Sequence, residues 1–74
     1  MSPVHLLVMD ILRSRGTVRM RQLIYLITEE GYTPSAVRKA VVDFSQPMCI
    51  NGNTLPTQIK VSVSNGRAYV ERVQ

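Results

Sequence analysis

Basic side chains from separate parts of the sequence are the residues whose type and spacing could do chemistry. They occur as Arg19 and Arg21, as the adjacent Arg38 and Lys39, and as Arg67 beside the dipeptide Asn65-Gly66. Arginine offers a planar fork of donors that matches a phosphate, and lysine offers a compact positive charge. Nine Lys or Arg residues against five Asp or Glu residues give a net charge of +4. This balance favours an acidic partner, although a basic protein can also bind nothing acidic.

Other reactive side chains do not form the pattern of an enzyme or a metal site. His5 is the sole histidine, and because no cysteine or carboxylate is spaced to work with it, we expect a surface or capping role. Cys49 is the sole cysteine, so the chain has no internal disulfide and no Cys/His cluster for zinc. No glycine loop of the phosphate-binding type is present. The sequence therefore predicts a protein that is not an enzyme and holds no cofactor or metal.

Length and composition predict one small domain spanning residues 1–74. A 74-residue chain is near the lower limit for folding without disulfides or metal, and its 45% hydrophobic content suffices for a single core. No signal-peptide pattern and no apolar run of membrane-spanning length is present. We therefore expect a cytoplasmic protein with no membrane partner.

The first two helices follow from capping signals and apolar spacing. Ser2 and Pro3 begin a helix over residues 3–15, and Gly16 ends it. Its apolar stripe consists of Val4, Leu7, Val8, Ile11 and Leu12. Leu6 and Met9 lie away from that stripe, either as scattered surface residues or as a tentative homodimer interface. Residues 17–20 form an extended connector or a very short strand before a second helix over residues 21–30, whose inward residues are Leu23, Leu26 and Ile27.

A third helix, over residues 34–45, carries the central pair of cations. Thr33 is its N-cap, Pro34 lies in its first turn, and the helix stops before Pro47. At helical spacing an apolar stripe faces inward, made of Val37, Ala40, Val41 and Phe44. The opposite side carries Ser35, Arg38, Lys39 and Val42. That side is either a solvated polar face or a face presented to a partner.

The C-terminal part of the chain predicts a loop followed by a β-hairpin. Residues 46–58 contain two prolines and an Asn51-Gly52 turn signal, so we expect mostly loop, with Met48 and Ile50 as anchors that could belong to a short strand. Residues 59–73 alternate around Asn65-Gly66, the dipeptide favoured in a two-residue hairpin turn. The implied register pairs Ser64 with Arg67 and Val61 with Val70. An apolar face of Ile59, Val61, Val63, Ala68 and Val70 is then expected to pack on the helices.

Three short helices followed by a hairpin, with Gly31 in the turn before the third helix, resemble the winged helix-turn-helix domain. The resemblance implies an α+β fold in which helix 34–45 enters the major groove of double-stranded DNA and the 64–67 tip acts as the wing. It implies a sequence-specific DNA-binding protein, acting as a small transcriptional regulator and as a homodimer. The expected DNA-binding residues are Arg19, Arg21, Thr33, Ser35, Arg38, Lys39, Val42, Asn65 and Arg67.

A second function fits the same fold. Winged helices also serve as dimerisation or protein-interaction modules, for example in viral or plasmid proteins that bind host factors. Leu6 and Met9, with exposed Tyr25 or Tyr69, would suit that role. Salt dependence separates the two hypotheses, because phosphate contacts weaken steeply with salt and an apolar interface does not.

Overall fold

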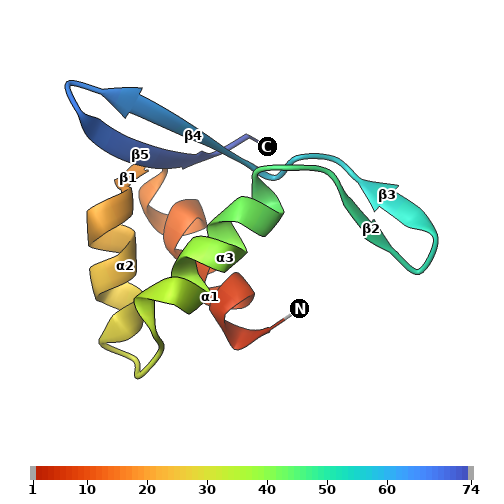
Figure 1. The fold of residues 1–74 in the computed structure, drawn as a ribbon, viewed down its shortest axis with the longest axis horizontal. Coiled ribbons are helices and arrows are strands. Elements are labelled where there is room, and N and C mark those ends of the chain that lie inside the picture. Colours follow the sequence, from red (N-terminus) through yellow and green to blue (C-terminus); the bar gives the residue numbers. More distant parts are fainter. Residues whose placement is uncertain (1, 74) are drawn as a thin grey trace.

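The computed structural model describes residues 2–73, which form three helices and two β-hairpins (Figure 1). In chain order the elements are α1 (Pro3–Arg15), β1 (Val18–Arg19), α2 (Met20–Thr28), α3 (Pro34–Phe44), β2 (Met48–Ile50), β3 (Asn53–Leu55), β4 (Ile59–Ser64) and β5 (Arg67–Arg72). The fold is α+β, as predicted. The helices pack on one another, and the sheet built from β1, β5 and β4 covers them on one side.

The helix boundaries agree closely with the signals in the sequence. The bounds of α1 are those predicted, although the Ser2 side chain makes no capping hydrogen bond. Helix α2 ends at Thr28, two residues earlier than predicted. A turn follows it, in which the Gly31 N–H donates to the Thr28 carbonyl at 3.0 Å. The Thr33 hydroxyl caps α3 by accepting a hydrogen bond from the Ala36 N–H at 3.2 Å.

The core lies where the three helices meet the base of the sheet. Its buried side chains are Val4, Val8, Leu12, Val18, Leu23, Ile27, Val37, Ala40, Val41, Phe44, Ile59 and Val70. The whole predicted inward stripe of α3 is among them, so α3 is held by that face against α1 and α2. Two assignments need correction: Met9 packs against the core rather than away from it, and Leu26 is only partly buried.

The three-stranded sheet has the order β1-β5-β4. Within it, β4 and β5 pair in the predicted register, with Ser64 opposite Arg67 and Val61 opposite Val70. The short β1 pairs with β5 and places Val18 opposite Val70, so Val18 reaches the core. Residues 17–20 are thus partly a strand.

The prediction that the whole apolar face of this hairpin packs on the helices is wrong. Ile59 and Val70 are buried, but Val61 is 40% exposed and Val63 is 73% exposed. The helices pack mainly on β5, whereas β4 is the edge strand of the sheet, so Val61 is exposed although it lies opposite the buried Val70. Val63 lies nearer the turn, where the hairpin runs on past the helices (Figure 1). Its outer half therefore stands free of the core.

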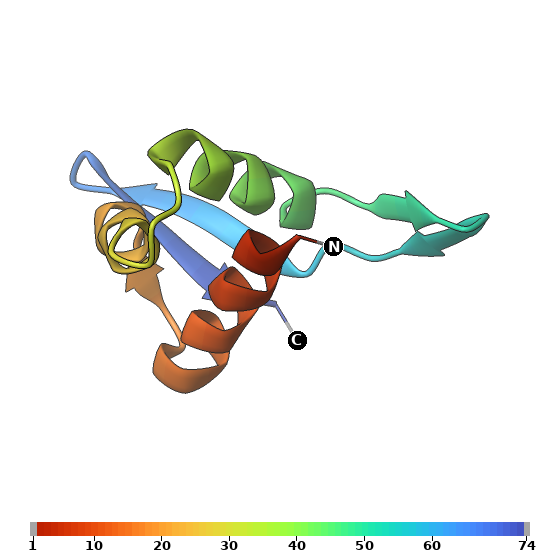
Figure 2. The ribbon, with the colours of Figure 1, turned by 90° about the horizontal axis from the view of Figure 1, so that it is seen from below.

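The segment between α3 and β4 is a second hairpin, not mostly loop. β2 and β3 pair antiparallel around Asn51 and Gly52, with Met48 opposite Leu55 and Ile50 opposite Asn53. Both turn residues have positive φ, 51° and 79°, as a type I′ turn requires. Met48 packs against the core, and the rest of the hairpin projects away from the helices (Figures 1 and 2).

No helix within residues 2–73 is both long enough and apolar enough to cross a membrane.

Candidate functional site

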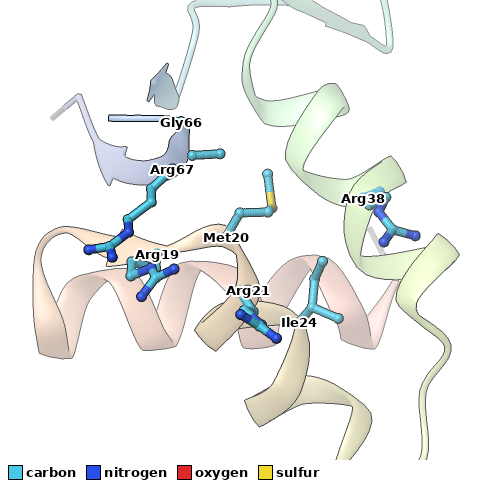
Figure 3. Close-up of a pocket in the computed structure, with 8 residues that line it drawn as sticks. Arg19, Met20, Arg21, Ile24, Arg38, Gly66 and Arg67 are labelled. Atoms are coloured by element: carbon cyan, nitrogen blue, oxygen red, sulfur yellow. The ribbon is translucent and has the colours of Figure 1, made fainter. Parts of the chain in front are cut away.

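Four arginines from four different elements line one open hollow of about 460 Å³. Arg19 comes from β1, Arg21 from the first turn of α2, Arg38 from α3, and Arg67 from the start of β5. In Figure 3, Arg19 and Arg67 lie on the same side of the hollow and Arg38 lies across from them. The remaining lining is apolar or backbone, from Met20, Ile24, Gly66 and Ala68. We call this feature the arginine hollow.

Strand geometry places the two arginines of the sheet. Val18 and Arg19 are neighbours in β1, and since successive side chains of a strand point to opposite faces, burial of Val18 directs Arg19 away from the core. Arg67 follows directly on the turn of the β4–β5 hairpin, where Asn65 and Gly66 have φ of 53° and 74°. This is again the type I′ geometry, which places Arg67 directly after a two-residue loop.

Within residues 2–73, no carboxylate pairs with the charges of the arginine hollow. No Asp or Glu lines it. In the part of the chain that the structure describes, none of its four arginines forms an ion pair with a carboxylate. Arg13 on α1 differs, because its guanidinium lies 3.4 Å from the Asp10 carboxylate. An anionic ligand in this hollow would therefore lie near guanidiniums from four elements, whose planar donors suit a phosphate.

The exposed side of α3 continues from the arginine hollow. Ser35, Arg38, Lys39 and Val42 are all exposed, opposite the buried stripe of the same helix. Only Arg38 of these four also lines the hollow. This side therefore presents two cations, a hydroxyl and a branched apolar side chain.

The nine residues expected to bind DNA do not all occupy equivalent places. The arginine hollow brings together Arg19, Arg21, Arg38 and Arg67. Asn65 lies in the turn beside them, whereas Ser35, Lys39 and Val42 extend the surface along α3. The Thr33 hydroxyl oxygen already accepts the capping hydrogen bond of α3, so its main role in this structure is to fix where that helix begins.

His5 has a partner that the sequence did not reveal. Its Nε2 donates to the Asp43 carboxylate at 2.8 Å, and its Nδ1 lies 2.6 Å from the Ser2 hydroxyl. The imidazole also meets the Phe44 ring edge-on, with centroids 5.2 Å apart. His5 therefore has a carboxylate partner that sequence spacing does not indicate, and with a side chain only 13% exposed it is not an ordinary surface residue. Because 38 residues separate the pair, only the packing of α1 on α3 could reveal it.

The tentative dimer interface is only partly at the surface. Leu6 is 55% exposed, but Met9 packs against the core and cannot contribute a full side chain to a contact. Tyr25 is also exposed, whereas Tyr69 is partly buried. Among the described residues, no group of three or more His, Cys, Asp or Glu side chains could hold a metal ion.

Comparison with known proteins gives no relative. No family model, no curated protein and no solved structure matches this chain.

Proposed function

We propose that the chain is a winged helix-turn-helix protein that binds double-stranded DNA in a sequence-specific manner, as a small transcriptional regulator. The order of elements supports this reading, because three helices with a strand after the first are followed by a hairpin that pairs with that strand. The observation that carries the proposal is the convergence of four unpaired arginines, from four elements, on one hollow without carboxylates.

The roles of the cations follow from where they lie. Arg19, Arg21 and Arg67 surround the hollow from the sheet and the start of α2, where they would contact phosphates of the backbone. Arg38 stands on the exposed side of α3, between the hollow and the rest of that side. With α3 in the major groove, Arg38 would donate to a guanine edge and Val42 would meet a thymine methyl group. The 64–67 turn is then the wing.

Fluorescence anisotropy on a labelled duplex of mixed sequence tests the proposal. If four arginines each neutralise one phosphate, affinity should fall roughly a hundredfold between about 50 and about 200 mM salt. An Arg13→Ala variant is the matched control, because it removes one charge from α1, outside the arginine hollow. It should bind nearly as the wild type does. Absence of binding at the lower salt concentration would overturn the proposal.

A protein-interaction module is the second candidate. Leu6 on α1 and Tyr25 on α2 are both more than half exposed, and neither lines the arginine hollow. Single exposed side chains of this size occur on many protein surfaces. Leu6 and Tyr25 are therefore weaker evidence for protein binding than the four arginines are for DNA binding. Binding to a protein partner through these side chains would depend little on salt, which separates it from DNA binding in the same assay.

A further inference from the structure

The β2–β3 hairpin has two open edges and an exposed apolar face. Within residues 2–73, β2 and β3 pair with each other and with no further strand. Their register places Met48, Ile50 and Leu55 on one face and Cys49 with Thr54 on the other. Ile50 and Leu55 are both exposed. A two-stranded hairpin of this kind is marginally stable in water by itself, so its free edge and apolar face are suited to a partner.

The geometry of the turn shows which backbone groups are free on β2. Ile50 and Asn53 close the type I′ turn, and in such a hairpin this closing pair exchanges both of its backbone hydrogen bonds. The next pair, Cys49 with Thr54, is then the non-hydrogen-bonded one. The N–H and C=O of Cys49 consequently point outward, along the open edge of β2.

The charge of the segment limits what can occupy that edge. Residues 46–58 contain no charged residue in a chain of net charge +4. The segment therefore has no cation that could bind nucleic acid or an anionic membrane surface. It also lacks the lysines that commonly protect an open strand edge from pairing. The segment itself therefore adds no charge repulsion when the same segment of a second copy approaches it. The hairpin also lies at the opposite end of the molecule from the β4–β5 turn (Figures 1 and 2).

We propose that two copies of this chain associate through β2, which pairs antiparallel with β2 of the second copy about a two-fold axis at Cys49. The outward N–H and C=O of each Cys49 then bond to those of the other, so that the contact is self-complementary. Ile50 of each copy lies opposite Met48 of the other, at the closer, non-hydrogen-bonded positions, where it meets the part of the Met48 side chain that the core leaves exposed. The two hairpins become one four-stranded sheet that carries the exposed Ile50 and Leu55 of both copies on one face, while Met48 of each copy packs partly against its own core.

The proposed β2–β2 contact is small, so the affinity between the two copies is low. Three residues of β2 on each side bury far less than the roughly 800 Å² per partner of a stable interface. The association is therefore weak and reversible, and a covalent trap detects it better than a measurement of mass. This proposal does not rest on DNA binding, and its test contains no DNA.

Disulfide trapping uses the single cysteine of the chain. Two residues facing each other as a hydrogen-bonded antiparallel pair have Cα atoms about 5.5 Å apart, inside the range that a disulfide spans. The purified protein is oxidised with a copper(II)–phenanthroline complex, which takes two electrons from the two thiols as two protons leave. Covalent dimer is then followed on non-reducing gels. Two comparison proteins carry Cys49→Ser together with Thr54→Cys on β3 or Val63→Cys on β4.

Each rate is divided by the rate at which the same thiol reacts with a small aromatic disulfide, which removes differences in intrinsic reactivity. The expected result is that Cys49 forms dimer about tenfold or more faster than either comparison protein, since pairing holds the two thiols together. A Cys49 rate no higher than that of Val63→Cys overturns the proposal. A higher rate for Thr54→Cys also overturns it, because the pairing edge would then be β3.

A charge introduced on β2 tests the apolar contact separately. Ile50→Lys places a cation opposite Met48 of the second copy, and it should reduce the Cys49 rate to that of Val63→Cys. Asn53→Lys is the matched control, because it adds the same charge to the same face of the hairpin but on β3. It should leave trapping largely intact. Thermal unfolding monitored by circular dichroism should be unchanged in both, since neither residue belongs to the core. Equal trapping by the two variants would contradict the proposed edge.

Discussion

His5 Nε2 lies 2.8 Å from the Asp43 carboxylate, which joins the first turn of α1 to the last turn of α3. The His5 side chain is 13% exposed and that of Asp43 is 30% exposed, so water screens the contact only in part. Phe44, next to Asp43, packs edge-on against the same imidazole. This contact fixes the C-terminal end of the helix whose exposed side carries Arg38 and Lys39.

The His5–Asp43 contact should contribute measurably to stability. In a double-mutant cycle of His5→Ala and Asp43→Ala, we expect a coupling free energy of about 1 kcal/mol, because a partly buried hydrogen bond to a charged group is lost. Urea unfolding followed by circular dichroism measures it. The exposed Asp10–Arg13 pair is the matched control, with an expected coupling of about 0.3 kcal/mol, as is typical of exposed ion pairs. Additivity within error at His5 and Asp43 would contradict a stabilising contact.

The two Asn-Gly turns should differ in what they contribute to global stability. Gly66 and Gly52 both have positive φ and open space around them, so alanine at either site is strained by its backbone alone, by about 1 kcal/mol. Gly66→Ala strains a hairpin that is anchored in the core through Ile59 and Val70, and it should lower the unfolding free energy by about that amount. Gly52→Ala strains a hairpin that projects from the body and can open locally, so global unfolding should change little. Equal losses would show that the β2–β3 hairpin unfolds together with the core.

An Asn-Gly dipeptide led to a correct hairpin prediction at residues 65–66 but not at residues 51–52. Around Asn65-Gly66 the strands are six residues long and alternate, so both the hairpin and its register could be predicted. Around Asn51-Gly52 the strands are three residues long and flanked by Pro47 and Pro56, which favour a loop. The turn chemistry was equally strong at both places. The second hairpin could not be predicted because its strands are too short to show an alternating pattern.

Other features depended on tertiary packing and left no local signal. The inward stripe of α3 follows from helical spacing, and Arg38 on its opposite side could be assigned without a structure. The resemblance to the winged helix-turn-helix domain predicts that Arg19, Arg21, Arg38 and Arg67 share one surface. That they line one hollow depends on how β1 pairs with β5, which the sequence alone does not show. The exposure of Val63 likewise depends on where the helices end beneath the sheet.

Arg38 and Arg67 should affect DNA binding in different ways. Arg38→Ala should reduce the preference for a selected sequence by about 1–3 kcal/mol, because a bidentate base contact is lost. Arg67→Ala should weaken binding to all duplexes alike and reduce the slope of log affinity against log salt by about 1. A selected sequence is obtained first by enrichment from a random duplex pool, and competition anisotropy then measures each variant. If both variants behave as Arg13→Ala does, the assignment of α3 and the 64–67 turn to DNA contact is wrong.

Mapping the amide chemical shifts of the protein during titration with duplex DNA tests the DNA-binding proposal most directly, because it locates the contact. Binding through the arginine hollow predicts the largest changes at residues 19–21, along the exposed side of α3, and at residues 65–67. The β2–β3 hairpin should change little at low protein concentration. No change at low salt, or changes confined to α1 or to the β2–β3 hairpin, would contradict the proposal.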